Sequence, residues 1–177
     1  MKENKTKYVI LGILNHEDCS GYDIKNRIDV ALSQFFSAGF GQIYPTLKQL
    51  VEEGMIINTE SSSKNGPERK VYQITKTGKI ELDNWLKIPV EKEDVRFEIL
   101  LKLFFAGNLN KEDILSHIEY FEKRNRLKLE KLQKMASELE GIMEESVDHK
   151  NYYLTALFGI RVHEAYLRWA EEAKILV

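Results

Sequence analysis

The sequence has few of the residues that characterise disulfide-bonded, disordered or membrane-spanning proteins. Among 177 residues there is one cysteine, Cys19, so no internal disulfide can form and we expect a reducing, cytoplasmic compartment. Three prolines and ten glycines are too few for a long linker. The apolar run at residues 8–14 is too short to cross a bilayer, and no signal-peptide cleavage site follows it. We therefore expect a globular protein without a membrane segment.

Signatures of catalysis and of metal binding are also missing. The four histidines lie far apart, and no cysteine or histidine pair has the spacing of a zinc site. The sequence contains no nucleophile elbow, no phosphate-binding loop and no dinucleotide-binding glycine pattern. We therefore predict a protein that is not an enzyme, with no catalytic residues, no metal and no cofactor.

No excess of one charge sign marks the chain as a polycation. The formal net charge is -2, and any contact with nucleic acid must therefore come from a local patch. Residues 1–87 hold 12 Lys and Arg against 11 Asp and Glu, a balance of +1, whereas residues 88–177 hold 14 against 17, a balance of -3. The asymmetry is small but has the sign that an N-terminal DNA-binding region requires.

The spacing of apolar residues predicts a mainly α-helical chain with one two-stranded hairpin. Helices are expected over 7–14, 22–36, within 39–54, and over 76–88, 95–107, 111–145 and 149–174; strands are expected over 55–61 and 69–75. Gly39 and Gly41 break the chain before the third helix, and Gly54 is placed to end it. Thr75 and Asn110 are predicted N-caps, and Asn65-Gly66 predicts the hairpin turn.

This order of elements predicts two domains. Three helices, a hairpin and a fourth helix over residues 1–88 form the pattern of a winged helix-turn-helix, whose third helix enters the major groove of DNA. Residues 95–177 are expected to form an α-helical, coiled-coil-like dimerisation domain.

The third helix is predicted to present a polar outer face to DNA. Its inward stripe is Ile43, Leu47, Leu50 and Val51. The outer and flanking residues expected to contact DNA are Gln42, Tyr44, Pro45, Thr46 and Lys48. Pro45 is expected in the first turn, where its missing N–H costs little.

The hairpin is predicted to add positive charge beside that helix. Lys64, Arg69 and Lys70 oppose Glu68 near the turn and are expected to contact phosphates. Two simpler interpretations stay open: the cations are ordinary surface charge, and Tyr44 is a partly buried aromatic that supports its helix. Tyr72 is expected to pack within the hairpin.

Three ordered motifs give the first half of the chain a resemblance to the PadR family of transcriptional regulators. They are Gly-Tyr-Asp at 21–23, Gly-Gln-Ile-Tyr-Pro-Thr-Leu at 41–47 and Gly-Pro-Glu-Arg-Lys-Val-Tyr at 66–72. The resemblance implies that the second motif forms the recognition helix and the third the wing. It also implies a repressor, and some members release DNA when a small aromatic or drug-like effector binds.

The second half resembles the longer members of that family, whose C-terminal helices build a homodimer. The seam Leu129, Leu132, Ala136, Leu139 and Met143 steps like a coiled coil. The final helix adds Leu157, Ile160, Tyr166 and Trp169 to the residues expected in the dimer. A two-fold dimer predicts an inverted-repeat operator in double-stranded DNA. One alternative function stays open, a protein-interaction module that binds no DNA. A second open question concerns seven aromatic residues, which either line an effector pocket or only form the core and the dimer seam. They are Trp85, Phe104, Phe105, Tyr152, Tyr153, Tyr166 and Trp169.

Overall fold

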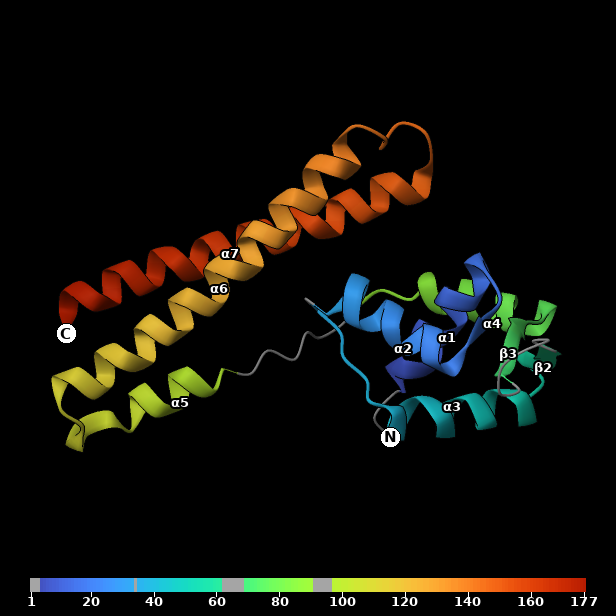
Figure 1. Cartoon of the computed structure of the whole chain (residues 1–177), viewed down its shortest axis with the longest axis horizontal. Helices are drawn as coiled ribbons and strands as arrows, with labels where there is room; N and C mark the ends of the chain where they lie inside the picture. Colours follow the sequence, from blue (N-terminus) through green and yellow to red (C-terminus); the bar gives the residue numbers. More distant parts are fainter. Residues whose placement is uncertain (1–3, 34, 62–68, 91–96) are drawn as a thin grey trace. The chain divides into compact units, whose positions relative to one another are not determined.

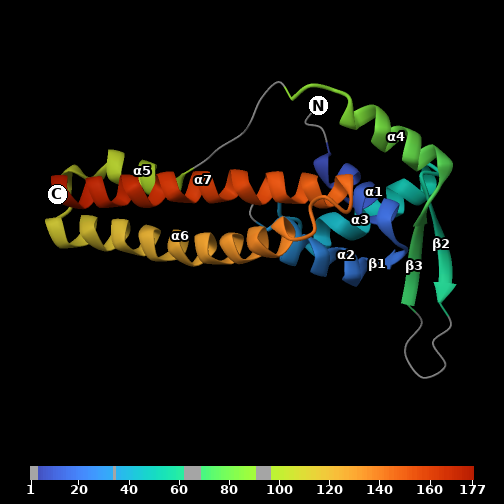
Figure 2. The same ribbon diagram turned by 90° about the horizontal axis from the view of Figure 1, so that it is seen from above.

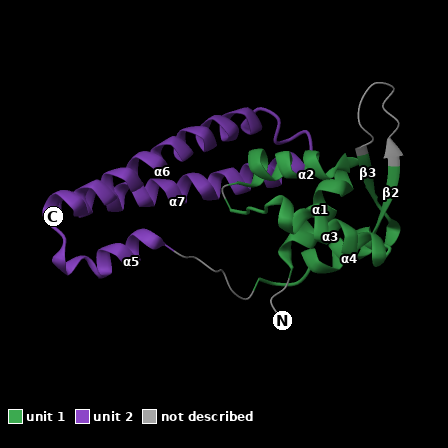
Figure 3. Ribbon diagram, turned by 60° about the horizontal axis from the view of Figure 1, so that its bottom comes forward, with its two compact units in different colours: residues 1–93 green, residues 94–177 purple. Residues whose placement is uncertain are grey.

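The structure is a computed structural model that describes residues 4–33, 35–61, 69–90 and 97–177. It contains two compact units, residues 1–93 (unit 1) and residues 94–177 (unit 2), shown in different colours in Figure 3. Each unit has its own core and is described by itself. No helix in the described ranges is long and apolar enough to span a lipid bilayer.

Unit 1 has the predicted order of helices and strands, with one additional strand (Figure 1). Its elements are α1 (Lys5–His16), β1 (Cys19–Ser20), α2 (Gly21–Arg27) continued by a π-helical turn (Ile28–Leu32), α3 (Phe40–Glu52), β2 (Ile56–Ser61), β3 (Arg69–Ile74) and α4 (Lys76–Leu86). The predicted hairpin strands are confirmed, and β2 and β3 form the long antiparallel ribbon visible in Figure 2. The Asn65-Gly66 turn lies outside the described residues.

The sheet has three strands in the order β1-β3-β2. No strand is predicted at residues 19–20, but Cys19 pairs with Tyr72 and Ser20 with Val71. The Ser20 side chain also caps α2, accepting a hydrogen bond from the Asp23 backbone N–H at 3.3 Å. Ser20 therefore belongs to the edge strand of the sheet and also caps the helix that follows.

The core of unit 1 joins all four helices to the inner face of the sheet. Its largest fully buried side chains are Ile10, Leu11, Leu14, Ile24, Ile28, Ile43, Leu47, Leu50 and Ile56. At the edge of this core α1 packs against α4, where the Tyr8 ring stacks on Trp85 with centroids 4.5 Å apart. The Lys7 ammonium lies 2.8 Å from the Glu81 carboxylate, and its hydrogen bond lowers the pKa of Glu81. The two ends of unit 1 are thus tied together.

The helix caps predicted at Gly54, Thr75 and Asn110 are confirmed. Gly54 follows α3 with a φ of 68°, a left-handed conformation that glycine adopts without strain. The Thr75 hydroxyl accepts from the Gly78 N–H at 3.2 Å, and the Asn110 side chain accepts from the Asp113 N–H at 2.8 Å. Gly78 lies so close to the chain at Met55 that a Cβ there would be 2.2 Å from the Met55 carbonyl oxygen.

Unit 2 is a long helical hairpin preceded by a short helix. It comprises α5 (Glu98–Phe104), a 3-10 turn (Ala106–Asn108), α6 (Lys111–Glu140) and α7 (Val147–Leu176). Helices α6 and α7 lie side by side in both views (Figures 1 and 2). Helix α6 ends at Glu140, earlier than the expected 145, and Ser146 caps α7 by accepting from the His149 N–H at 3.1 Å.

The coiled-coil seam of α6 packs within its own chain. Leu132 and Ala136 are buried against Ala156 and Ile160 of α7, with Leu129 and Leu139 at the margin of this cluster. Leu132 therefore does not need a second chain to cover it, contrary to expectation, because α7 folds back onto it, and Ile160 of α7 is covered in turn by α6. Met143 lies beyond the end of α6 and is half-buried, as is Leu157 on α7.

Candidate nucleic-acid interface

Helix α3 has one buried face and one open face. Ile43, Leu47 and Leu50 are buried in the core as predicted, whereas Val51 is exposed, contrary to the expected stripe. Val51 lies in the last turn, where the core no longer extends far enough to cover it. The exposed residues of the outer face include Gln42, Tyr44, Pro45, Lys48 and Gln49.

The start of α3 explains how a proline fits near the open face. Phe40 is the first helical residue, and the Gln42 side-chain oxygen accepts from the Gly39 backbone N–H at 3.2 Å. This cap starts the helix before Gly41, which is therefore helical and does not break the chain. Pro45 consequently lies in the second turn and not in the first, so the Gly41 carbonyl loses its usual i+4 donor. An open carbonyl and a rigid ring result on the exposed side of the helix.

Thr46 was expected on the flank of that face, but it is buried, with 5% of its surface exposed. Its hydroxyl donates to the Gln42 carbonyl at 2.7 Å and accepts from the Asn4 side-chain amide at 3.4 Å. A hydroxyl that bonds within its own helix can face the core without losing a partner. Thr46 therefore supports the helix from inside and is not one of its outward groups.

Tyr44 is both packed and half-exposed. A Cβ on Gly21 would lie 2.7 Å from its ring, so the absence of a side chain at Gly21 lets the ring lie against α2. The ring also stacks on Phe40 at 5.8 Å, and Phe40 on Tyr22 at 6.5 Å. Yet 49% of Tyr44 remains exposed, so supporting the helix does not prevent contact with a ligand.

The exposed rings of Tyr22 and Phe40 were not among the residues selected from the sequence. Together with Tyr44 they form a row of three stacked aromatic side chains beside the open face of α3. The signal available in the sequence was the i, i+4 spacing of Phe40 and Tyr44 on a helix whose apolar stripe lies elsewhere. Tyr72, by contrast, is buried in the sheet as expected, and burial raises the pKa of its phenol.

The cations near α3 are only partly described. Lys48 is 80% exposed, with its ammonium 3.8 Å from the Glu52 carboxylate, a separation typical of a weak surface pair. Lys70 is exposed on β3. Arg69 is placed by its backbone, opposite Ser61 in the ribbon. Lys64 lies outside the described residues, so its role stays a prediction.

In unit 2 two half-buried aromatic residues of α7 pack against α6. The rings of Tyr166 and Trp169 contact Phe121 of α6, with centroids 5.7 Å and 5.3 Å apart. Burial raises the pKa of the Tyr166 phenol. Within the described ranges, no group of three or more His, Cys, Asp or Glu side chains is arranged to hold a metal ion.

Four neighbouring apolar side chains in and just after α5 are exposed. They are Leu100, Leu101, Phe104 and Phe105. None of the seven residues of α5 is buried, and Phe104 is 83% exposed. An apolar surface of this kind is typical of a protein–protein contact.

Comparison with known proteins assigns both halves of the chain. Residues 10–84 match the transcriptional regulator PadR-like family, and residues 95–176 match the family described as virulence activator alpha C-term. The chain is 32% identical over 179 residues to the negative transcriptional regulator PadR of Bacillus subtilis, covering 97% of this chain and 96% of that protein.

Solved structures agree over the same length. The structure of Bacillus subtilis PadR in complex with operator DNA has a TM-score of 0.81 and 31% identity, covering 97% of each chain. The same protein in complex with p-coumaric acid has a TM-score of 0.76 and 32% identity, covering 96% of each chain. This chain therefore belongs to the PadR-like family of transcriptional regulators, a family of regulators and not of enzymes.

Proposed function

We propose that this protein is a homodimeric repressor that binds an inverted-repeat operator through α3 and leaves it when a small-molecule effector binds. The observation that carries the proposal is the open face of α3. Ile43, Leu47 and Leu50 hold the helix rigidly in the core. The opposite side presents amide, phenol and ammonium groups, which suit base edges and phosphates. The operator-bound relative supports this assignment because it is similar over the whole chain.

The charge of α3 is graded along the helix. Gln42 lies in the first turn of α3 and Lys48 before its last turn, whereas Glu52 is the last helical residue and Glu53 is the C-cap. In helix-turn-helix proteins the N-terminal residues of the recognition helix usually reach the bases. Carboxylates at the opposite end disfavour deep insertion of that end among phosphates. We therefore assign Gln42 and Lys48 to contacts with DNA bases. We assign Tyr44, Arg69 and Lys70 to contacts with the phosphate backbone of the DNA.

A second copy of the chain is the partner that best suits unit 2. The exposed apolar residues at α5 need cover, and two copies related by a two-fold axis would cover them reciprocally. Leu157, Tyr166 and Trp169 are only half-buried and extend the surface available to that copy. A dimer would set two α3 helices about 34 Å apart, one turn of DNA, and so require an inverted repeat. The relative solved with p-coumaric acid supports an effector-responsive regulator.

Binding of the full-length chain to DNA from upstream of its own gene tests the proposal. We expect saturable binding that survives excess unrelated duplex and protects an inverted repeat from nuclease cleavage. If the unrelated duplex competes for binding as well as the unlabelled upstream DNA does, the result would contradict sequence-specific recognition. No binding at all, together with capture of a defined protein partner, would favour an interaction module instead.

Two lysines should separate base reading from phosphate contact. Lys48→Ala is expected to change the preference among operator variants by about 1–3 kcal/mol at the affected base pair, because it removes a groove-facing donor. Lys70→Ala is expected to weaken all duplexes equally and to reduce the salt slope of log K by about one. Fluorescence anisotropy at several salt concentrations measures both effects.

Lys134→Ala is the matched control, since this exposed lysine on α6 pairs only loosely with Glu138, at 4.0 Å. It should leave both the preference and the slope unchanged. A Lys48 variant that weakens every operator equally would move this residue from the base readers to the backbone contacts.

A further inference from the structure

We infer that Gln42 recognises guanine, because the hydrogen bond that caps α3 turns its oxygen back to the helix and its NH2 group toward the DNA. The inference rests on the proposed function, since it takes α3 to be the helix that enters the major groove. It goes further by naming the base, and the edge of that base, which this side chain contacts.

The first turn of α3 is closed on Gly39. The Gly39 carbonyl accepts from the Gln42 N–H at 2.9 Å and from the Ile43 N–H at 3.0 Å. The Gly39 N–H donates in turn to the Gln42 side-chain oxygen at 3.2 Å. Gln42 is the third residue of the helix, the position from which glutamine or glutamate commonly reaches back to the cap. The side chain of Gln42 is therefore already held when no DNA is bound.

The chemistry of the cap decides which half of the Gln42 amide faces outward. A backbone N–H can only donate, so the amide atom that it meets must be the oxygen. The NH2 group, with its two N–H donors, is the half that stays available to a ligand. Gln42 is exposed, and no group within the described ranges accepts a hydrogen bond from this NH2.

The backbone that carries Gln42 is also held from inside. Ile43, the next residue, is fully buried in the core of unit 1. The buried Thr46 hydroxyl donates to the Gln42 carbonyl at 2.7 Å. Because both the backbone and the side chain are ordered beforehand, Gln42 loses less conformational entropy when it contacts a base.

The base edges of the major groove differ in how well they match a pair of donors. Guanine presents two acceptors there, O6 and N7, whereas adenine presents one acceptor beside a donor and cytosine presents a donor. The usual bidentate contact of glutamine with adenine needs the amide oxygen and the NH2 group at the same base edge. The cap directs the oxygen of Gln42 elsewhere. The partial positive charge at the N-terminus of α3 also favours an edge made of acceptors.

A second glutamine on the same face is held in a different way. Gln49 follows Gln42 by seven residues, about two turns, so both lie on one side of α3. The Gln49 NH2 group donates to the Glu53 carboxylate at 2.6 Å. Its donor is thus engaged within the helix, whereas that of Gln42 is open. Gln49 is therefore a matched control position for changes at Gln42.

Single-atom changes in the operator test the inference on the full-length protein. Each guanine of the protected half-site is replaced in turn by 7-deazaguanine, which lacks the N7 acceptor and still pairs with cytosine. We expect one position at which the unaltered chain binds about fivefold more weakly, the effect of one lost hydrogen bond. Gln42→Met should bind the two operators equally at that position, because it has no donor to lose.

Gln42→Glu should change the preferred base rather than remove the preference. Glutamate can form the same cap, but it replaces the two donors with an acceptor. At the position identified above, this variant should prefer cytosine, whose N4 amino group donates to a carboxylate, over guanine. Gln49→Glu adds the same charge to the same face of α3. It should weaken all operators by similar factors and leave the preference for guanine unchanged.

Three results would overturn the inference. They are a preference of the unaltered chain for adenine at that position, no effect of 7-deazaguanine at any guanine, and the same preference in Gln42→Glu as in the unaltered chain. Any of these in a chain that binds its operator specifically contradicts the role of Gln42 alone. A chain that binds no operator contradicts the proposed function together with this inference.

Discussion

A chain shortened to residues 1–90 is expected to lose operator affinity by about two to four orders of magnitude, the usual range for losing one of two linked binding sites. The core of unit 1 is complete within these residues, so the shortened chain should keep its fold. It should nevertheless be a monomer, because the apolar surface at α5 is gone. With a charge balance near zero, a single α3 has little long-range attraction to add to its contacts in the groove.

Sedimentation and operator binding, measured on the same samples, decide this prediction. Joining residues 1–90 to an unrelated dimeric coiled coil is the control, and it should restore part of the lost affinity. Equal affinity of the shortened and full-length chains would mean that one unit 1 suffices. A full-length chain that sediments as a monomer at micromolar concentration would contradict the dimer and the inverted repeat together.

Gly78→Ala is expected to lower the free energy of unfolding of unit 1 by about 3 kcal/mol or more, because it forces a side chain into occupied space. The added Cβ would lie 2.2 Å from the Met55 carbonyl oxygen and 2.9 Å from Ile74. That carbonyl already accepts from the Thr75 N–H at 3.0 Å. Neither the backbone at Met55 nor the first turn of α4 can move away without breaking this hydrogen bond and the Thr75 cap.

Urea unfolding followed by the fluorescence of Trp85, in a Trp169→Phe background, measures unit 1 alone. Gly12→Ala on α1 is the matched control, since a Cβ there meets nothing within 4 Å. It should raise the free energy of unfolding by about 0.5–1 kcal/mol through helix propensity. Equal effects of Gly78→Ala and Gly12→Ala on the free energy of unfolding would show that the close contact at Met55 does not destabilise unit 1.

Local patterns predicted most of the fold because local chemistry determines them. The stripe of Ile43, Leu47 and Leu50 follows from the helical period, and the caps at Thr75 and Asn110 need only a side chain and the next turn. Strand β1 could not be predicted in this way. It is two residues long, and its only reason to be extended is its pairing with β3, more than fifty residues away.

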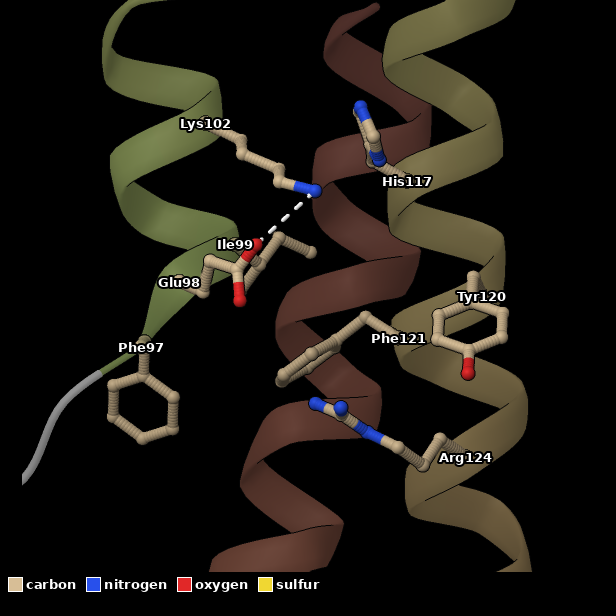
Figure 4. A pocket seen from close by; sticks show the side chains of 8 residues that line it. All are labelled: Phe97, Glu98, Ile99, Lys102, His117, Tyr120, Phe121 and Arg124. Atoms are coloured by element: carbon tan, nitrogen blue, oxygen red, sulfur yellow. Dashed lines mark ion pairs between the residues drawn. The ribbon is translucent and has the colours of Figure 1, made fainter.

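Sequence patterns did not predict the packing at the candidate sites, because spacing and polarity do not specify which part of the chain a side chain contacts. The spacing of Leu132 and Ala136 indicates that the seam is covered but not which helix covers it, and α7 of the same chain does so. The polarity of Thr46 suggested an outward position, but a hydroxyl can bond to the preceding turn and face inward. Lys102 of α5 and Arg124 of α6 line one pocket, shown in Figure 4, and because they come from different helices no linear motif could predict this.

The pairing of α1 with α4 has a consequence for how the protein is made. Tyr8 donates to Glu81 at 3.2 Å and stacks on Trp85, so α1 finds its partner only after α4, the last helix of unit 1, has left the ribosome. Until then the apolar faces of α1 and α3 remain partly exposed. The nascent chain therefore avoids aggregation only if chaperones bind it or if the rest of unit 1 is synthesised quickly. Helices α6 and α7 follow one another directly and can pair soon after synthesis. Unit 1 is therefore expected to set the pace of cotranslational folding, and a pause in translation before α4 is complete would be more damaging than one within unit 2.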